Sequence, residues 1–341
     1  MTDWQKFFLV RLPLAALALG LATELTGYLL SGVALHRHNV DDLAAAVTHD
    51  THPYGVVLLG DSVTHNVAHK FRIGKPEEVA DLTTHALAGL PSSLFLLRRY
   101  LETGHQPKLV ILAVSRNVFV LPVPRDTFQL YIQSVFTRPF ERQFLQKYYG
   151  NDVDYRWRPA ALAVESKVIE PLFSLLRNPK SEIWVAPDVP SRKPELDRFP
   201  DDSDDPTVLA QWVATPFELR PEARAVLIEI CRLAREYHFE LHLIWAPLEP
   251  GLRRALESKD SLQHLNSQLT QVFAENDTPV RIDDSSTRRT YPYFDDGLIH
   301  IKGAGWEQAY ADDLGDYIHE FEANDGMARP ALSSGQTASS K

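Results

Sequence analysis

The sequence predicts an α/β fold with a doubly wound, mainly parallel sheet, an N-terminal transmembrane helix and a large insertion. Short apolar runs alternate along the chain with segments of helical apolar spacing. The run KLVILAV at 108–114 is almost continuously apolar, which suits a strand buried on both faces. Strand, helix and strand repeated in this way imply parallel strands with helices on both sides of the sheet. The 341 residues are enough to bury such a core.

The first 35 residues predict a membrane anchor. Two basic residues precede the apolar stretch Leu12–Leu35, in which Glu24 is the only charge, and this length spans a bilayer. The basic start places the N-terminus in the cytoplasm and the main domain in the periplasm, held at the inner membrane by a single pass. Because a carboxylate is costly in lipid, Glu24 is a candidate contact with a membrane partner. The alternatives are a signal peptide cleaved near Gly20-Leu21-Ala22, and a core helix of a cytoplasmic protein.

The predicted elements follow in order after a linker at 36–53, which holds a short helix near 40–47. The α/β domain covers 54–322, with strands at 55–59, 81–87, 108–114, 240–246 and 279–283. Helices are predicted at 92–103, 220–237, 252–275 and 303–321. An insertion rich in aromatic residues and proline occupies about 120–215, and 323–341 reads as a disordered tail.

Composition excludes several classes of protein. The net charge of −10 argues against a nucleic-acid binder, which would carry a basic surface. The single cysteine, Cys231, lies in a predicted helix and is expected in the core, because one thiol forms no internal disulfide. No glycine-rich phosphate loop is present, so neither a nucleotide nor another cofactor is expected. His65 and His69 have a spacing that can bind a metal on a helix, but no third ligand is evident and no metal is expected.

The candidate chemistry lies where the predicted strands end. Ser62 follows the first strand in the stretch GVVLLGDSVTHN (55–66), where a following helix would point its N-terminus. Backbone N–H groups at that position can stabilise an oxyanion, and a serine nucleophile needs a base. His300 follows the last strand, and Asp295 and Asp296 stand shortly before it. Active sites of doubly wound sheets lie beyond the carboxyl ends of the strands, so Ser62 and His300 are expected to meet there.

GDS after the first strand, and an aspartate followed by a histidine before the last helix, resemble the first and last motif blocks of the SGNH (GDSL-type) hydrolase superfamily. The resemblance implies a three-layer, flavodoxin-like fold with Ser62 as nucleophile, His300 as base and Asp296 as the acid that orients the histidine. The family spaces these two residues as DxxH. Gly297 occupies that aspartate position here, so Asp295 is the alternative acid.

The middle motif blocks of the same family imply the remaining site residues. In HALAGLPSS (85–93) the resemblance assigns Gly89, and in AVSRNVF (113–119) it assigns Asn117, to the oxyanion site together with the Ser62 N–H. Asp61, inside the GDS motif, is placed at the same pocket. Ser115 or Arg116 is the alternative to Asn117 for the residue that faces the pocket.

A narrower resemblance comes from the predicted anchor, the exported domain and HIKGAGW (300–306). Together these features resemble the extracytoplasmic acyl-transfer proteins, which include the D-alanyl-transfer protein of teichoic acid modification and proteins of alginate O-acetylation. The resemblance implies a serine esterase or O-acyltransferase that acts on a cell-surface polysaccharide beside a membrane-bound O-acyltransferase. Two alternatives remain: a plain exported carboxylester hydrolase, and a non-catalytic scaffold that binds a glycan or a membrane partner.

Overall fold

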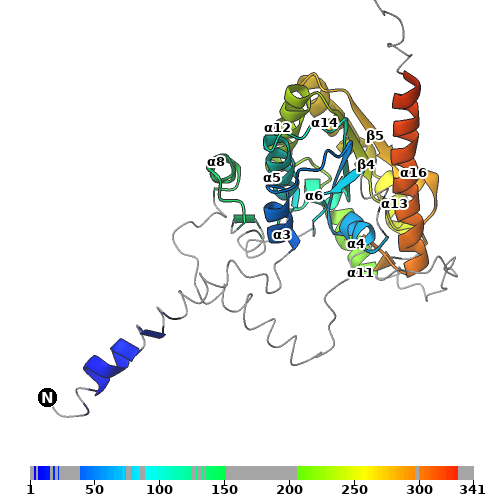
Figure 1. Ribbon diagram of the computed structural model, residues 1–341. Helices are drawn as coiled ribbons and strands as arrows, with labels where there is room; N and C mark the ends of the chain where they lie inside the picture. Colours follow the sequence, from blue (N-terminus) through cyan, green and yellow to red (C-terminus); the bar gives the residue numbers. More distant parts are fainter. Residues whose placement is uncertain are drawn as a thin grey trace, which may run out of the picture.

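The computed structural model in Figure 1 describes residues 4, 7–15, 18–19, 22, 39–71, 73, 78–84, 89–123, 128, 132–133, 135–150, 206–292, 294–295 and 299–328. Its centre is a five-stranded parallel sheet in the order β2-β1-β3-β4-β5. The strands are β1 Val56–Gly60, β2 Val79–Asp81, β3 Leu109–Val114, β4 Glu240–Trp245 and β5 Val280–Asp284. A short antiparallel hairpin, β6 Phe294–Asp295 and β7 His300–Ile301, lies outside this sheet. The predicted α/β class with a parallel sheet is confirmed.

Helices cover both faces of the sheet (Figure 1). Around the strands the structure has α3 Asn39–Ala46, α4 Ser62–Phe71, α5 Gly89–Glu102, α6 Asn117–Val120, α8 Pro139–Tyr148, α11 Pro206–Ala214, α12 Pro221–Tyr237, α13 Pro250–Glu257, α14 Ser261–Glu275, α15 Ser285–Arg288 and α16 Ala304–Ala328. Helices α3, α5, α12 and α14 pack in one apolar cluster, and α4 and α16 pack in the other. Cys231 of α12 is fully buried in the first cluster, as predicted.

Strands β1 and β3 are apolar throughout because each side of the sheet has its own core. In β1, Val57 and Leu59 pack into the cluster with α5 and α12, whereas Val56 and Leu58 pack into the cluster with α4 and α16. Side chains along a strand alternate between faces, so a strand covered on both faces needs apolar residues at every position. This explains why a continuous apolar run was the correct strand signal here.

Three predicted elements differ from the structure. The second strand was predicted at 81–87 but is β2, Val79–Asp81, where Val79 pairs with Val56. Beyond β2 the chain still donates backbone hydrogen bonds to β1, from Leu82 N to Leu58 O at 2.8 Å and from Thr84 N to Gly60 O at 3.0 Å. Those bonds keep residues 82–84 extended alongside β1, although they follow the end of β2. The prediction therefore began and ended the strand a few residues too late. Residues 85–88 lie outside the described part.

The helix predicted at 252–275 is two helices, α13 and α14. The break falls at Asp260, whose φ of 55° is left-handed, and the apolar spacing changes there. Leu252 and Leu256 are four residues apart and lie on one face of a helix. The next buried leucine, Leu262, does not follow at three or four positions, so it would lie on a different face of the same helix. The sequence therefore held a signal for this break.

The last helix, α16, continues to Ala328, beyond the predicted end at Phe321. Residues 323–328, predicted to open a disordered tail, are therefore helical, and 329–341 lie outside the described part. At the other end, η1 Phe7–Arg11 is a short π-helical turn. In the part of the chain that the structure describes, no helix is both long and apolar enough to cross a membrane. Most of the predicted anchor, and residues 151–205 of the predicted insertion, fall outside that part.

Candidate active site

The GDS motif forms a tight junction between β1 and α4. Gly60 is the last residue of β1, and a Cβ atom there would lie 2.8 Å from Ala113 O of β3 and 2.8 Å from Thr64 Cβ of α4. Only glycine allows this approach. The hydroxyl of Thr64 donates to the same Ala113 O at 2.8 Å, which ties the first turn of α4 to β3. Because this turn is fixed to two strands, Ser62 at the start of α4 has a defined position.

Ser62 and His300 meet, although they are 238 residues apart. Ser62 Oγ lies 2.7 Å from His300 Nε2. Ser62 is 7% exposed, and His300 is half-buried at the start of β7. The β6–β7 hairpin pairs Asp295 with His300 and Phe294 with Ile301, and Ile301 is buried in the core beside α4 and α16. A hydroxyl in direct hydrogen-bond contact with an imidazole is the arrangement that nucleophilic catalysis by serine needs.

The acid that orients His300 stays a prediction. Asp296 lies outside the described residues, and only the backbone of Asp295 is placed, opposite His300 in the hairpin.

Asp61 is buried between β1 and β3, and its carboxylate is an acceptor for several donors. Asp61 Oδ2 accepts from Ser115 N at 2.8 Å and also from the Ser115 hydroxyl, and Oδ1 accepts from Val63 N at 3.0 Å. Burial raises the pKa of Asp61 above its ordinary value, whereas these hydrogen bonds and the charge of His300 oppose the rise. Asp61 therefore caps α4, joins the carboxyl ends of two strands, and acts electrostatically on His300.

The two predicted oxyanion residues sit differently from each other. Gly89 is the first residue of α5 and has a φ of +56°, which accounts for glycine there. Asn117 opens α6, and its side-chain oxygen contacts the Ser115 hydroxyl. Asn117 is therefore linked through Ser115 to Asp61. Asn117 thus supports the site indirectly, by way of the Asp61 carboxylate.

Arg116 is the functional candidate that sequence reasoning left as a minor alternative. It is 2% exposed, and its Nη2 lies 2.7 Å from Asp284 Oδ2 at the end of β5. Its guanidinium carbon stacks 4.7 Å above the Trp245 ring, and Nη1 contacts Ala246 O at 3.4 Å. Burial lowers the pKa of Arg116, and Asp284 opposes that shift. A charged residue two positions after β3 and another at the end of β5 were the available signals.

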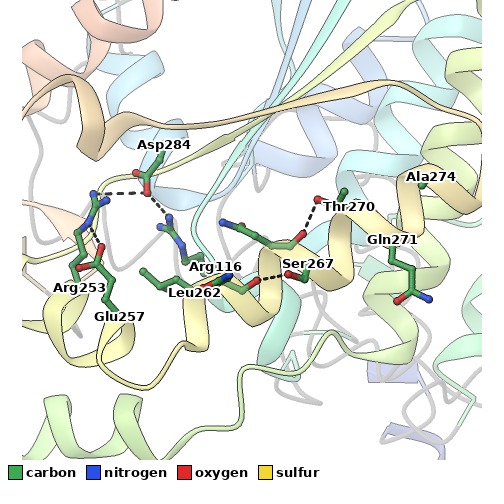
Figure 2. A pocket seen from close by; sticks show the side chains of 11 residues that line it. Arg116, Arg253, Glu257, Leu262, Ser267, Thr270, Gln271, Ala274 and Asp284 are labelled. Carbon is green, nitrogen blue, oxygen red and sulfur yellow. Dashed lines mark hydrogen bonds and ion pairs between the residues drawn. The ribbon is translucent and has the colours of Figure 1, made fainter.

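A polar cavity of about 700 Å³ opens beside this ion pair (Figure 2). Arg116, Arg253, Glu257 and Asp284 lie at one end of it, and the polar face of α14 forms its wall. In Figure 2, dashed contacts join both arginines to Asp284 and Arg253 to Glu257. Ser62 and His300 do not line this cavity, so it is a neighbour of the serine–histidine pair rather than its pocket.

Two groups of potential metal ligands occur among the described residues. His65 Nδ1 lies 3.2 Å from Thr83 Oγ1, and the rings of His65 and His69 stack with centroids 5.5 Å apart. The described part of the chain has one cluster with metal-like spacing, Glu78, His319 and Glu322, whose ligand atoms lie within 4.8 Å of one another. It joins the start of β2 to the end of α16, and we assign no ion to it.

No family model matches the chain, and no curated protein matches it. Among solved structures, a GDSL-like lipase from Bacteroides thetaiotaomicron has 10% identity and a TM-score of 0.39, over 84% of this chain and 98% of that one. A protein from Streptococcus pneumonia named for platelet activating factor has 13% identity and a TM-score of 0.37, over 89% and 99%. At such values neither likeness carries a conclusion about activity.

Proposed function

We propose that the chain is a serine esterase or O-acyltransferase that acts on acyl esters through an acyl-serine intermediate. The observation that carries the proposal is the 2.7 Å contact between Ser62 Oγ and His300 Nε2 at the carboxyl edge of a parallel sheet. A serine hydroxyl is a weak nucleophile by itself, and a base at hydrogen-bond distance removes that limit. Ser62 is the first residue of α4, so the positive end of the helix dipole lies beside the hydroxyl and favours negative charge there.

The proposed reaction has two half-reactions. Ser62 Oγ forms a bond to the acyl carbon while its proton passes to His300 Nε2. The ester C–O bond then breaks, and the leaving alcohol takes that proton. Next, a water or sugar hydroxyl gives its proton to His300 and attacks the acyl carbon, and Ser62 recovers its proton. The Ser62 N–H and the Gly89 N–H are proposed donors to the oxyanion in both tetrahedral states.

Two carboxylates are proposed to assist His300 in different ways. Asp296, or Asp295, would hold the imidazole tautomer through the other ring nitrogen. Asp61 has a structural basis, because its buried carboxylate interacts electrostatically with His300. A negative charge near the imidazole offsets the positive charge that develops on the ring in the transition state of each half-reaction.

We further propose that the domain lies outside the cytoplasm, anchored at the inner membrane, and that its substrate is a cell-surface polysaccharide supplied beside a membrane-bound O-acyltransferase. The apolar sequence before residue 36 supports this proposal. Trp4, Phe7 and Phe8 near the N-terminus have exposed rings, which suits burial in lipid or against a partner. Protease added to spheroplasts is expected to digest the domain, and complete resistance of the chain would contradict this location.

The activity is tested by labelling the full chain, purified in detergent micelles, with a fluorophosphonate probe and weighing the intact protein. One adduct is expected. It should disappear in Ser62→Ala and fall sharply in His300→Ala, because the first variant lacks the nucleophile and the second lacks the base. Ser258→Ala is the matched control, since this residue is exposed and its hydroxyl donates to Ala255 O of α13, the helix that it follows. No adduct on folded wild-type protein would overturn the proposal and favour the non-catalytic scaffold.

A further inference from the structure

The cavity beside Arg116 is a groove along α14, and its lining combines polar and charged residues with the apolar Leu262 and Ala274. On α14, Gln263, Ser267, Thr270 and Gln271 line it, and all four side chains are exposed. They recur at intervals of three and four residues, which places them along one face of the helix. The lining runs from Leu262 to Ala274, which corresponds to about 18 Å of helix. This groove suits an extended ligand with many hydrogen-bonding groups.

The charged end of the groove is balanced. Arg253 Nε lies 2.8 Å from Glu257 Oε1, and Arg253 Nη1 lies 3.7 Å from Asp284 Oδ2. Arg116 pairs with the same Asp284 oxygen at 2.7 Å. Two cations therefore face two anions, and neither sign is in excess for a charged ligand. The lining as a whole offers amides and hydroxyls, which both donate and accept hydrogen bonds, as sugar hydroxyls do.

Arg116, at the charged end of the groove, has one hydrogen-bond donor without an acceptor among the described residues. That donor is Nε, which is buried. A buried N–H without a partner is unfavourable. A ligand oxygen that accepted a hydrogen bond from the reoriented guanidinium would therefore be stabilised there. This observation is independent of the polar side chains on α14, and it concerns a residue that lines the charged end of the groove.

The groove is connected to the serine–histidine pair through the edge of the sheet. Arg116 directly follows Ser115, whose N–H holds Asp61 beside Ser62. From there the Arg116 side chain crosses the end of β4 to reach Asp284 on β5. Because β1 and β5 are three strand positions apart, their ends are separated by about 14 Å. A polymer whose ester reaches Ser62 could extend its chain into the groove.

We propose that the groove between α14 and the end of β5 binds the sugar chain of a neutral, O-acylated polysaccharide. This inference rests on the proposed function for its link to catalysis, but its binding is measurable without catalysis. Among the described residues that line the groove there is no aromatic ring. Recognition therefore depends on hydrogen bonds, and the affinity rises with the number of sugar units that fill the groove.

Binding is tested on the full chain in detergent micelles, with Ser62→Ala to prevent turnover. The probes are unacetylated xylohexaose, cellohexaose and mannohexaose, and a hexamer of mannuronic acid is the anionic comparison. Calorimetric titration is expected to show binding of at least one neutral hexamer, tighter than the matching dimer and tighter than the anionic hexamer. Absence of binding by all three neutral hexamers, or preference for the anionic one, would overturn the inference.

Variants locate the binding in the groove. Gln263→Ala with Gln271→Ala removes two amides and is expected to weaken binding about tenfold, the effect of two neutral hydrogen bonds. Ser267→Tyr fills the groove and should abolish binding. His264→Ala is the matched control, since this residue is exposed on the same helix but bonds Glu218 outside the groove. Equal affinity in the control and the groove variants would refute the location.

A second readout separates this inference from the proposed activity. In the chain with Ser62 intact, the groove variants should raise KM for O-acetylated xylohexaose about tenfold and leave 4-nitrophenyl acetate hydrolysis within about twofold. Sugar binding without fluorophosphonate labelling would retain the groove and reject the esterase. Labelling without sugar binding would retain the esterase and reject the groove.

Discussion

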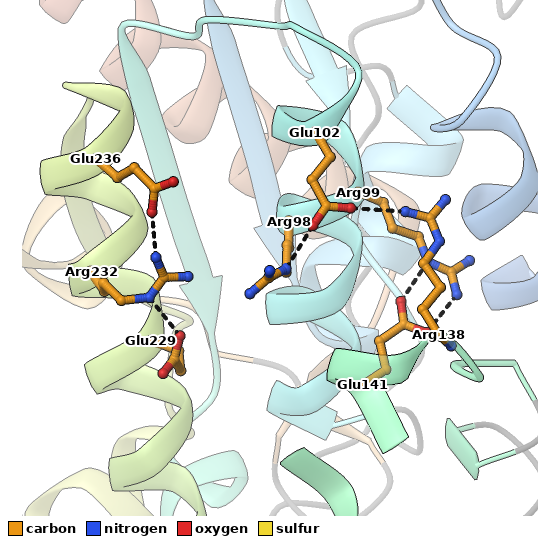
Figure 3. A network of polar contacts seen from close by, with 8 residues as sticks. All are labelled: Arg98, Arg99, Glu102, Arg138, Glu141, Glu229, Arg232 and Glu236. Atoms are coloured by element: carbon orange, nitrogen blue, oxygen red, sulfur yellow. Dashed lines mark hydrogen bonds and ion pairs between the residues drawn. The ribbon is translucent and has the colours of Figure 1, made fainter. Parts of the chain in front are cut away.

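The buried ion pair between Arg99 and Glu141 gives the sharpest stability prediction. Arg99 of α5 donates from Nε and Nη2 to the two carboxylate oxygens of Glu141 in α8, at 2.6 and 2.8 Å (Figure 3). The two side chains are only 9% and 3% exposed. Other contacts of Arg99 are long, at 3.3 Å to Ala44 O and 3.3 Å to Val135 O. Glu141→Gln would leave a buried cation without its counter-charge, so we expect a loss of about 3 kcal/mol in the free energy of unfolding.

The same figure supplies the control. Glu102 bonds Arg98 at 2.8 Å and Arg138 at 3.0 Å, but these side chains are 26% to 40% exposed. Solvent screens such pairs, and Glu102→Gln is expected to cost less than about 1 kcal/mol. Urea unfolding of the full chain in micelles, followed by circular dichroism, measures both. Equal costs would refute the reasoning. Replacing the buried pair by Arg99→Met with Glu141→Leu should recover most of the loss, because no uncompensated charge remains.

Two further predictions concern the sheet. Gly60→Ala places a Cβ 2.8 Å from Ala113 O and is expected to cost about 1–3 kcal/mol by overpacking and to slow fluorophosphonate labelling; Gly55→Ala, with nothing within 4 Å, should change neither. Burial lowers the pKa of His242, whose Nδ1 contacts Tyr317 at 3.0 Å, so the unfolded state binds more protons below about pH 6.5 and stability falls as pH drops. His242→Asn should reduce the difference in urea midpoint between pH 7.5 and 5.5, and an unchanged difference would reject the assignment.

Much of the framework could be predicted from local pattern. Apolar runs identified β1 and β3 because both faces of the sheet are covered there, and β4 and β5 were predicted to within one residue of their bounds. The expectation that Ser62 and His300 meet followed from one rule, that parallel strands end at a common edge. Boundaries were less accurate where the signal depended on a partner. The extent of β2, for example, is determined by its pairing with β1, which no residue in 79–87 reveals.

The supporting contacts of the site could not be predicted in the same way. The sequence indicated that Asp61 is a turn residue or a pocket residue, but not what its carboxylate contacts. Its hydrogen bonds to Ser115 depend on the register of β1 against β3. The pair of Arg116 and Asp284 joins residues 168 positions apart. Each is an ordinary charged residue after a strand, and only the strand order brings them within reach.

The sequence by itself determined the parallel sheet, the glycine and serine at the end of β1, and the histidine before the last helix. These features are local, because apolar periodicity and turn chemistry act between residues close in the chain. Tertiary structure alone decided the 2.7 Å approach of Ser62 to His300, the burial of Asp61, and the polar groove headed by Arg116. Those depend on strand order and helix packing, which are set by the burial of the whole core and not by any single segment.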